Sequence, residues 1–140
     1  MRRLSSIALL AGLLLPALAG CGMSDAVDSA KNSVNTFHFM LNDAKYDAIY
    51  DASDPLLQKA ADRAALRKVF SKIRERMGSC SDPTDWGYLY NVTTQGRFVK
   101  LTDKASCTNG PISEEFQWRI SGKQCLLVSY HAESPLLGDD

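Results

Sequence analysis

Signatures of catalysis are missing from this sequence. It contains no Cys-x-x-Cys pair, no Gly-x-Ser-x-Gly nucleophile motif and no glycine-rich phosphate loop. Histidine is scarce, because His38 and His131 are the only two in the chain. Zinc is usually held by several cysteines or histidines at short spacings. The sequence therefore predicts no catalytic residue, no metal and no cofactor.

An excess of charge of one sign is also missing. Sixteen lysines and arginines balance sixteen acidic residues, and no long run of like charge occurs. This balance gives no reason to expect nucleic acid as a partner and excludes an acidic solvating tail. No internal repeat or low-complexity segment interrupts the 140 residues. One domain with its own core is the expectation.

The first twenty residues have the three parts of a secretory signal peptide. Arg2 and Arg3 supply a positive start, and the stretch 4–15 that follows has no charged residue. Pro16 interrupts the run, and small residues then lead to Cys21. A membrane-spanning helix is the alternative, but it needs about 20 apolar residues and only about 17 are present. We expect residues 1–20 to be removed on export.

The segment Leu18-Ala19-Gly20-Cys21 resembles the lipobox of bacterial lipoproteins. The resemblance implies cleavage between Gly20 and Cys21 and acylation of Cys21 with fatty acids such as palmitate, which makes the bilayer a partner. The competing interpretation is an ordinary cleaved signal peptide that is followed by a cysteine only by chance. Gly22, in place of an aspartate, favours the periplasmic face of the outer membrane by analogy with enteric lipoproteins. Cleavage would leave 120 residues with a formal charge of −2.

Helical periodicity dominates the first half of the remaining chain. Residues 21–25 are expected to form a lipidated tether, followed by a helix over 26–41 with Asp25 as N-cap. A short helical turn is predicted over 44–51. Asp54 and Pro55 predict another helix start, because proline fits the first helical position. The clearest helix is predicted over 63–77, between Asp62 as cap and Gly78.

After Gly78 the period changes from helical to alternating. Four strands are expected over 88–94, 98–107, 113–121 and 124–132. In the third, Phe116, Trp118 and Ile120 alternate with polar residues, so these three should face the helices. The prediction is an α+β domain over 26–134, with two or three N-terminal helices on one face of a curved four-stranded antiparallel meander. Residues 135–140 are expected to form a frayed tail.

Three cysteines remain once Cys21 is taken by lipid. An oxidising compartment should bridge one pair and leave one thiol free. In a meander, Cys107 ends the second strand close to the turn that holds Cys80, whereas Cys125 begins the fourth strand at the other end of the sheet. The sequence therefore predicts Cys80–Cys107, with Cys107–Cys125 as the competing pair.

The order of short motifs in the chain resembles a family of small bacterial proteins of unknown function. The segments that carry the resemblance are Tyr46-Asp47-Ala48-Ile49-Tyr50, Phe98-Val99-Lys100-Leu101, Glu114-Glu115-Phe116-Gln117-Trp118 and Leu127-Val128-Ser129-Tyr130. That family is similar to the cone-shaped fold shared by nuclear transport factor 2 and ketosteroid isomerase, and the resemblance spans most of residues 26–134. It implies a fold that often encloses a pocket, and it carries over no catalytic residue.

Two functions from different classes remain open. The first is a non-enzymatic binding or assembly module that meets a periplasmic protein. The second is a pocket for a small ligand, built from Phe116, Trp118 and Tyr130. Such a pocket could bind its ligand with or without isomerase- or hydratase-like catalysis. Acid–base chemistry in such a pocket would need an acid, a base and a hydroxyl donor. The candidates for these roles are Tyr46, Asp47, Tyr50, Tyr130 and His131. His38 is interpreted as a partly buried or surface histidine.

Overall fold

The computed structural model describes residues 22–138. The helices are α1 (Met23–Asn42), α2 (Tyr46–Asp51), α3 (Pro55–Ala60) and α4 (Arg63–Met77). The strands are β1 (Asp85–Thr93), β2 (Gly96–Cys107), β3 (Gly110–Ser121) and β4 (Gln124–Glu133). The predicted signal peptide and Cys21 lie outside the described residues. Within residues 22–138, no helix is long and apolar enough to cross a membrane.

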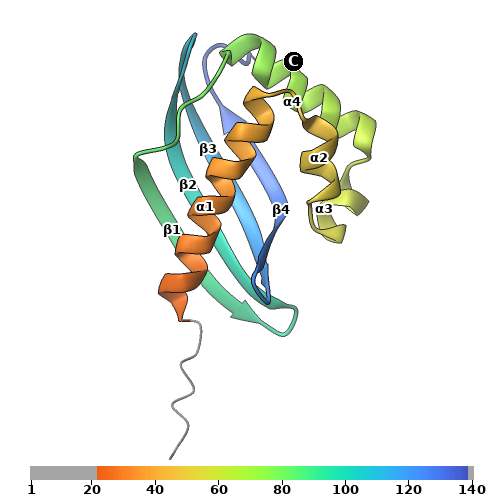
Figure 1. Ribbon diagram of the computed structural model, residues 1–140, viewed down its shortest axis with the longest axis vertical. Coiled ribbons are helices and arrows are strands. Elements are labelled where there is room, and N and C mark those ends of the chain that lie inside the picture. Colours follow the sequence, from red (N-terminus) through yellow and green to blue (C-terminus); the bar gives the residue numbers. More distant parts are fainter. Residues whose placement is uncertain (1–21, 139–140) are drawn as a thin grey trace, which may run out of the picture.

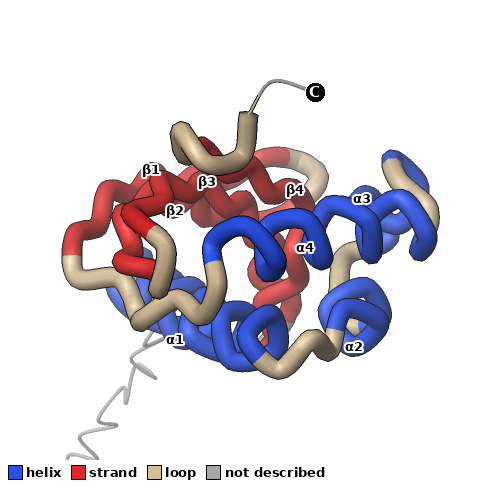
Figure 2. The backbone as a smooth tube through the Cα atoms, turned by 90° about the horizontal axis from the view of Figure 1, so that it is seen from above, coloured by secondary structure: helices blue, strands red, loops and turns tan. Residues whose placement is uncertain are grey.

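The four strands form one antiparallel sheet in the order β1-β2-β3-β4. Helices α1 and α4 lie across one face of this sheet, with α2 beside them (Figures 1 and 2). We call this face the inner face and the opposite face the outer face. The predicted α+β class, the meander and the helical layer are confirmed.

Helix α1 begins at Met23, three residues before the predicted start. Gly22 is the N-cap residue, and Asp25 lies in the first turn instead of capping the helix. An acidic side chain in the first turn is favourable there, because it faces the positive end of the helix dipole. The expected tether of residues 21–25 is therefore wrong for residues 23–25, which are helical.

The starts of α3 and α4 follow the capping rules that the sequence predicts. The Asp54 carboxylate accepts a hydrogen bond from the Leu56 N–H, and Pro55 takes the first helical position. The Asp62 carboxylate accepts one from the Ala65 N–H. Helix α4 ends at Met77, and its C-cap residue Gly78 has a φ of +75°, which favours glycine. The Asp54 and Asp62 carboxylates thus satisfy N–H groups that have no partner inside the helix.

Aromatic side chains fill the space between the helices and the sheet. Phe37 from α1, Phe70 from α4 and Phe116 from β3 are almost completely buried. The Phe37 ring lies 5.6 Å from Phe70 and 5.1 Å from Phe116, both in edge-to-face geometry. Trp118 also faces inward, so the predicted register of the third strand is correct. A slip of one residue would have turned these rings to solvent.

Residues 134–138 pack against the domain. The Arg76 guanidinium of α4 donates hydrogen bonds to the carbonyl oxygens of Leu136 and Leu137. The Leu137 side chain packs against the core. The expectation of a frayed tail is therefore wrong for residues 135–138, because Arg76 of α4 holds this segment against the domain. Residues 139 and 140 lie outside the described part.

Cys80 and Cys107 form a disulfide, as predicted, and Cys125 is a free thiol. The bridge joins the segment after α4 to the end of β2. Asn42 reinforces this junction, because its amide donates to the Cys80 carbonyl and its side-chain oxygen accepts from the Cys80 N–H. A disulfide in the fold indicates an oxidising, extracytoplasmic compartment.

Candidate functional site

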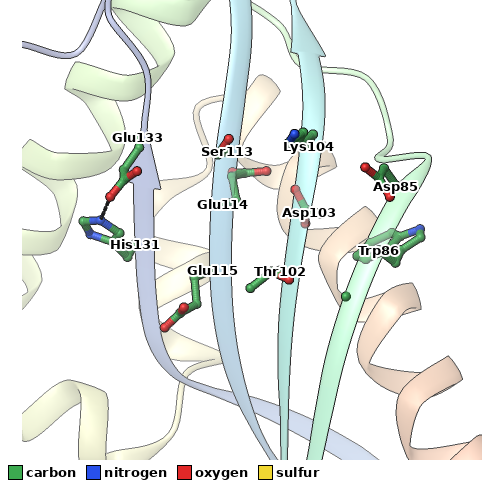
Figure 3. Close-up of a pocket in the computed structure, with 11 residues that line it drawn as sticks. Asp85, Trp86, Thr102, Asp103, Lys104, Ser113, Glu114, Glu115, His131 and Glu133 are labelled. Carbon is green, nitrogen blue, oxygen red and sulfur yellow. Dashed lines mark hydrogen bonds and ion pairs between the residues drawn. The ribbon is translucent and has the colours of Figure 1, made fainter.

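A polar groove of about 430 Å³ crosses the outer face of the sheet (Figure 3). Two rows of residues line it, each with one residue from every strand. The strand register places Asp85, Lys104, Ser113 and Glu133 in one row. It places Gly87, Thr102, Glu115 and His131 in the other.

A third row lies between these two and forms the floor of the groove. It contains Trp86, Asp103, Glu114 and Ala132. Because side chains alternate along a strand, these four point to the inner face. The floor of the groove is therefore main chain, and its walls are side chains.

The groove has acidic and hydrogen-bonding walls. Its carboxylates are Asp85, Glu115 and Glu133, and its donors include Lys104, Thr102 and Ser113. Two of the carboxylates have neighbours: Lys100 lies 2.9 Å from Glu115, and His131 Nε2 lies 3.0 Å from Glu133. The groove suits a polar partner that offers hydrogen-bond donors.

Gly87 keeps one wall of the groove open. A Cβ atom at this position would lie 2.5 Å from the Thr102 hydroxyl oxygen. Any side chain there would displace Thr102, so glycine leaves room for that hydroxyl. This requirement is steric and independent of backbone angles.

A cluster of titratable side chains lies directly beneath the groove floor, on the inner face. Glu114 is at its centre and is almost fully buried. The Tyr130 hydroxyl donates to Glu114 Oε1 over 2.6 Å, and His38 Nε2 lies 2.6 Å from Glu114 Oε2. Asp103, opposite Glu114 in the register, completes the group.

Asp103 holds a proton at neutral pH. Its two oxygens accept no hydrogen bond from any donor in the part of the chain that the structure describes. Burial, followed by the charge of Glu114, raises the pKa of Asp103 to about 8, against an opposing effect of His38. The protonated Asp103 therefore adds no second negative charge beside the buried Glu114.

His38 and Tyr130 respond to the same carboxylate. Burial lowers the pKa of His38, but the hydrogen bond and charge of Glu114 outweigh it, and the net pKa is raised. Burial, followed by the charge of Glu114, raises the pKa of Tyr130 well above its usual value. Tyr130 therefore stays neutral and acts as a donor. Hydrogen bonds to Glu114 therefore connect α1, β3 and β4 through one buried carboxylate.

The residues predicted to form an inner pocket lie on the inner face but pack closely. Phe116 contacts Tyr130 and Trp118, with ring centroids 5.0 and 5.9 Å apart. The space beside Trp118, between α1, α2 and the sheet, is only about 120 Å³. Ligand pockets usually measure about 300 Å³ or more.

The predicted acid–base candidates do not come together. Asp47 forms ion pairs with Arg67 and Arg63 on the surface of α4. Tyr46 and Tyr50 pack at the edge of the core, and His131 lies on the outer face beside Glu133. Only Tyr130 belongs to the buried cluster.

The sequence analysis did not predict that His38, Asp103 and Glu114 form one buried cluster. A signal was present: Glu114 is two residues before Phe116, and Asp103 is two after Leu101, so both share the inward face of their strands. The interpretation of His38 as a partly buried or surface histidine understated its burial. The structure leaves its side chain almost fully buried against Glu114.

No protein-family model matches the chain. A search of curated proteins finds no match either. The class that the fold defines is a small α+β domain with a helical layer on a four-stranded antiparallel meander.

Proposed function

We propose that this protein is a lipid-anchored, extracytoplasmic binding or assembly module without enzymatic activity. Its partner would be a periplasmic protein that docks in the groove on the outer face. The anchor would be acylated Cys21, and the site of action the periplasmic face of the outer membrane.

One observation carries the binding function: the inner side of the sheet is filled, whereas the outer side is open. The inner space is packed with aromatic rings and leaves about 120 Å³ beside Trp118. The outer groove of about 430 Å³ has polar walls contributed by all four strands. This contrast favours docking of a partner over the alternative of an enclosed small-molecule pocket.

The titratable cluster gives little support to an enzyme. His38, Asp103 and Glu114 are each at most 5 % exposed. The hydrogen bonds of the Glu114 side chain are made to His38 and Tyr130, and the Asp103 oxygens make none to any described residue. A general acid or base must reach a proton on its substrate. We therefore assign the cluster a structural role in holding α1 against the sheet.

Export and anchoring are supported by two independent features. The N-terminal sequence resembles a lipoprotein signal, and the Cys80–Cys107 bridge fits an oxidising compartment. The resemblance to the cone-shaped fold of nuclear transport factor 2 and ketosteroid isomerase agrees with helices in front of an antiparallel sheet. It stays a proposal, and no catalytic role is taken from it.

The position of the groove suits a protein anchored at its N-terminus. The turns at 94–95 and 122–123 lie at the same end of the domain as the start of α1 (Figure 1). The rows that line the groove lie toward the opposite ends of the strands, near Asp85 and Glu133. A chain held at Cys21 would therefore present the groove away from the membrane.

Site-specific photocrosslinking in the producing cells tests the docking surface. A photoreactive residue at Thr102, on the groove wall, should yield one crosslinked species with the lipidated protein. Glu115→Lys in the same chain should abolish this species, because it reverses a charge in the groove. The matched control is Glu75→Lys on α4, which should leave the yield unchanged.

A result at another position would contradict the proposal. If a photoreactive residue at Lys68 on α4 crosslinks as strongly as one at Thr102, the outer groove is not the docking surface. The proposal also fails if no crosslink forms at Thr102 while the protein remains folded and membrane-bound.

A further inference from the structure

The two edge strands of the sheet, β4 and β1, differ in whether another segment pairs with them. At the β4 edge, Ser53 forms a parallel bridge with Leu127, and the Asp54 N–H donates to the Leu127 carbonyl over 2.9 Å. A register shift at Gln117/Trp118 also distorts the pairing of β3 with this strand. At the other edge, β1 pairs with β2 alone among the described strands, and no element lies beyond it (Figure 1).

Strand β1 lacks the features that usually protect an edge. Natural edge strands carry lysine, proline, bulges or covering segments, because free N–H and C=O groups attract other strands. From Trp86 to Thr93 the strand has no charged residue and no proline, and its pairing with β2 is regular. Three of its large side chains are more than half exposed: Tyr88, Leu89 and Val92.

The hairpin register identifies which main-chain groups of β1 are free. A two-residue turn at 94–95 joins β1 to β2, and Thr93 and Gly96 flank it. The residues that flank such a turn form a hydrogen-bonded pair, and the pattern alternates along the strand. The odd-numbered residues of β1 therefore face β2. The free N–H and C=O groups belong to Trp86, Tyr88, Tyr90 and Val92.

We propose that β1 pairs antiparallel with β1 of a second copy of this chain, in a register centred on Leu89. Each copy then offers the same strand, as a two-fold symmetric interface requires. The two sheets would continue into one across the pair.

This register satisfies the free groups and matches the side chains. Tyr88 lies opposite Tyr90 of the other copy, and Trp86 lies opposite its Val92. These are hydrogen-bonded pairs made by the outward groups of both strands. Aromatic and aromatic–β-branched pairs across strands are favourable. The two Leu89 side chains meet on the outer face, at a position where neither strand has outward hydrogen-bonding groups.

Charge also favours a second copy as the occupant. Like charges directly opposite each other destabilise antiparallel pairs. In the proposed register the only charged residue of β1, Asp85, lies opposite Thr93 of the other copy. Because β1 is uncharged from Trp86 to Thr93, it pairs with itself in this register without opposing like charges.

Cysteine crosslinking of the mature lipidated protein in detergent tests the register. In a Cys125→Ser background, Leu89→Cys should form an intermolecular disulfide under mild oxidation. Opposed residues at such a position have Cα atoms about 4.5 Å apart. The matched control is Val92→Cys, because Val92 and Leu89 are 62 % and 63 % exposed. Two copies of residue 92 would lie roughly 20 Å apart at about 3.3 Å per residue.

The proposal predicts a covalent dimer with Leu89→Cys and at least tenfold less with Val92→Cys. Equal crosslinking of both variants, or none with Leu89→Cys, overturns it. This outcome does not depend on the groove, so it is separate from the proposed function.

Charge insertion supplies a second measurement. Leu89→Lys would place two lysines opposite each other and should convert the dimer to a monomer in light scattering. Val69→Lys, at an exposed position of α4, should leave the mass unchanged. Unchanged far-ultraviolet circular dichroism would show that both variants fold. A wild-type protein that is monomeric at high micromolar concentration contradicts the proposal.

Discussion

His38 on α1 and Glu114 on β3 are 76 residues apart in sequence and 2.6 Å apart at their side-chain atoms. Both side chains are almost fully buried. Burial of a polar group is costly unless it is hydrogen-bonded, and this contact pairs His38 Nε2 with Glu114 Oε2. His38 Nδ1 is also buried and has no hydrogen-bond partner among the described residues. Tyr130 donates a hydrogen bond to the same carboxylate, and Asp103 lies opposite Glu114 in the strand register. The contact therefore fixes how α1 lies on the sheet.

The raised pKa of Asp103 predicts a stability that falls as pH rises. Asp103 keeps its proton to about pH 8 in the folded domain, whereas an ordinary aspartate loses it near 3.8. Between these values the folded state binds more protons than the unfolded state, so the free energy of unfolding decreases with pH. The raised pKa of His38 acts in the same direction. Its contribution to stability is complete below pH 6.5, the pKa in the unfolded state, and is lost as the pH rises through the folded-state pKa.

Asp103→Asn isolates the contribution of Asp103. The amide carries no titrating proton, so this variant should lose less stability than the wild type between pH 5 and pH 8. Urea unfolding at both pH values measures the difference. Asp85→Asn, an exposed carboxylate in the groove, is the matched control and should behave as the wild type. Equal losses of stability for Asp103→Asn and the wild type between these pH values would contradict the raised pKa of Asp103.

Arg119 should be needed to keep Asp54 buried. Its guanidinium makes two hydrogen bonds to the Asp54 carboxylate, of 2.6 and 2.8 Å, and the Asp54 side chain is fully buried. Arg119→Met would leave that charge without a cation and should cost about 3 kcal/mol. Lys100→Met, which breaks the exposed pair with Glu115, should cost at most about 1 kcal/mol. Equal losses in denaturant unfolding would show that Asp54 is stabilised by other means.

Removing the disulfide should destabilise the domain without changing its fold. The bridge closes a separation of 27 residues. On the chain-entropy model, replacing both Cys80 and Cys107 with serine should cost roughly 3–4 kcal/mol. Guanidinium unfolding measures this loss, with Cys125→Ser as a control for loss of a thiol. A loss below about 1 kcal/mol would mean that the bridge restrains the unfolded chain less than this model assumes.

Replacing Cys21 should release the protein from membranes. Cys21→Ser removes the sulfur that would carry the lipid, and stable anchoring needs more than one acyl chain. The variant should move from the membrane fraction to the periplasmic fraction, and mass spectrometry should show loss of acyl groups. Retention in the membrane fraction with an unchanged mass would refute acylation at this residue.

Local rules account for the parts of the fold that the sequence predicts. The bounds of α4 follow from Asp62 and Gly78, which act on the nearest main-chain groups. Alternation predicts the inward face of β3, because a strand has only two faces. The Cys80–Cys107 pair follows from the meander order combined with the length of the strands. Each of these predictions needs only neighbours in sequence or a simple strand order.

Long-range contacts decided the rest. The position of residues 134–138 depends on Arg76, about 60 residues earlier in the chain. The groove depends on strand register, which places Asp85 and Glu133 in one row although they lie at opposite edges of the sheet.

The sequence by itself determined the helical and strand segments, the inward faces and the disulfide, because capping, periodicity and strand length are local properties. Only the tertiary structure decided that Glu114 would meet His38, Tyr130 and Asp103. A carboxylate on an apolar face is stable only if other elements bring donors to it, and which elements do so depends on packing angles and register. For the same reason the aromatic rings filled the inner space and left the open groove on the outer face.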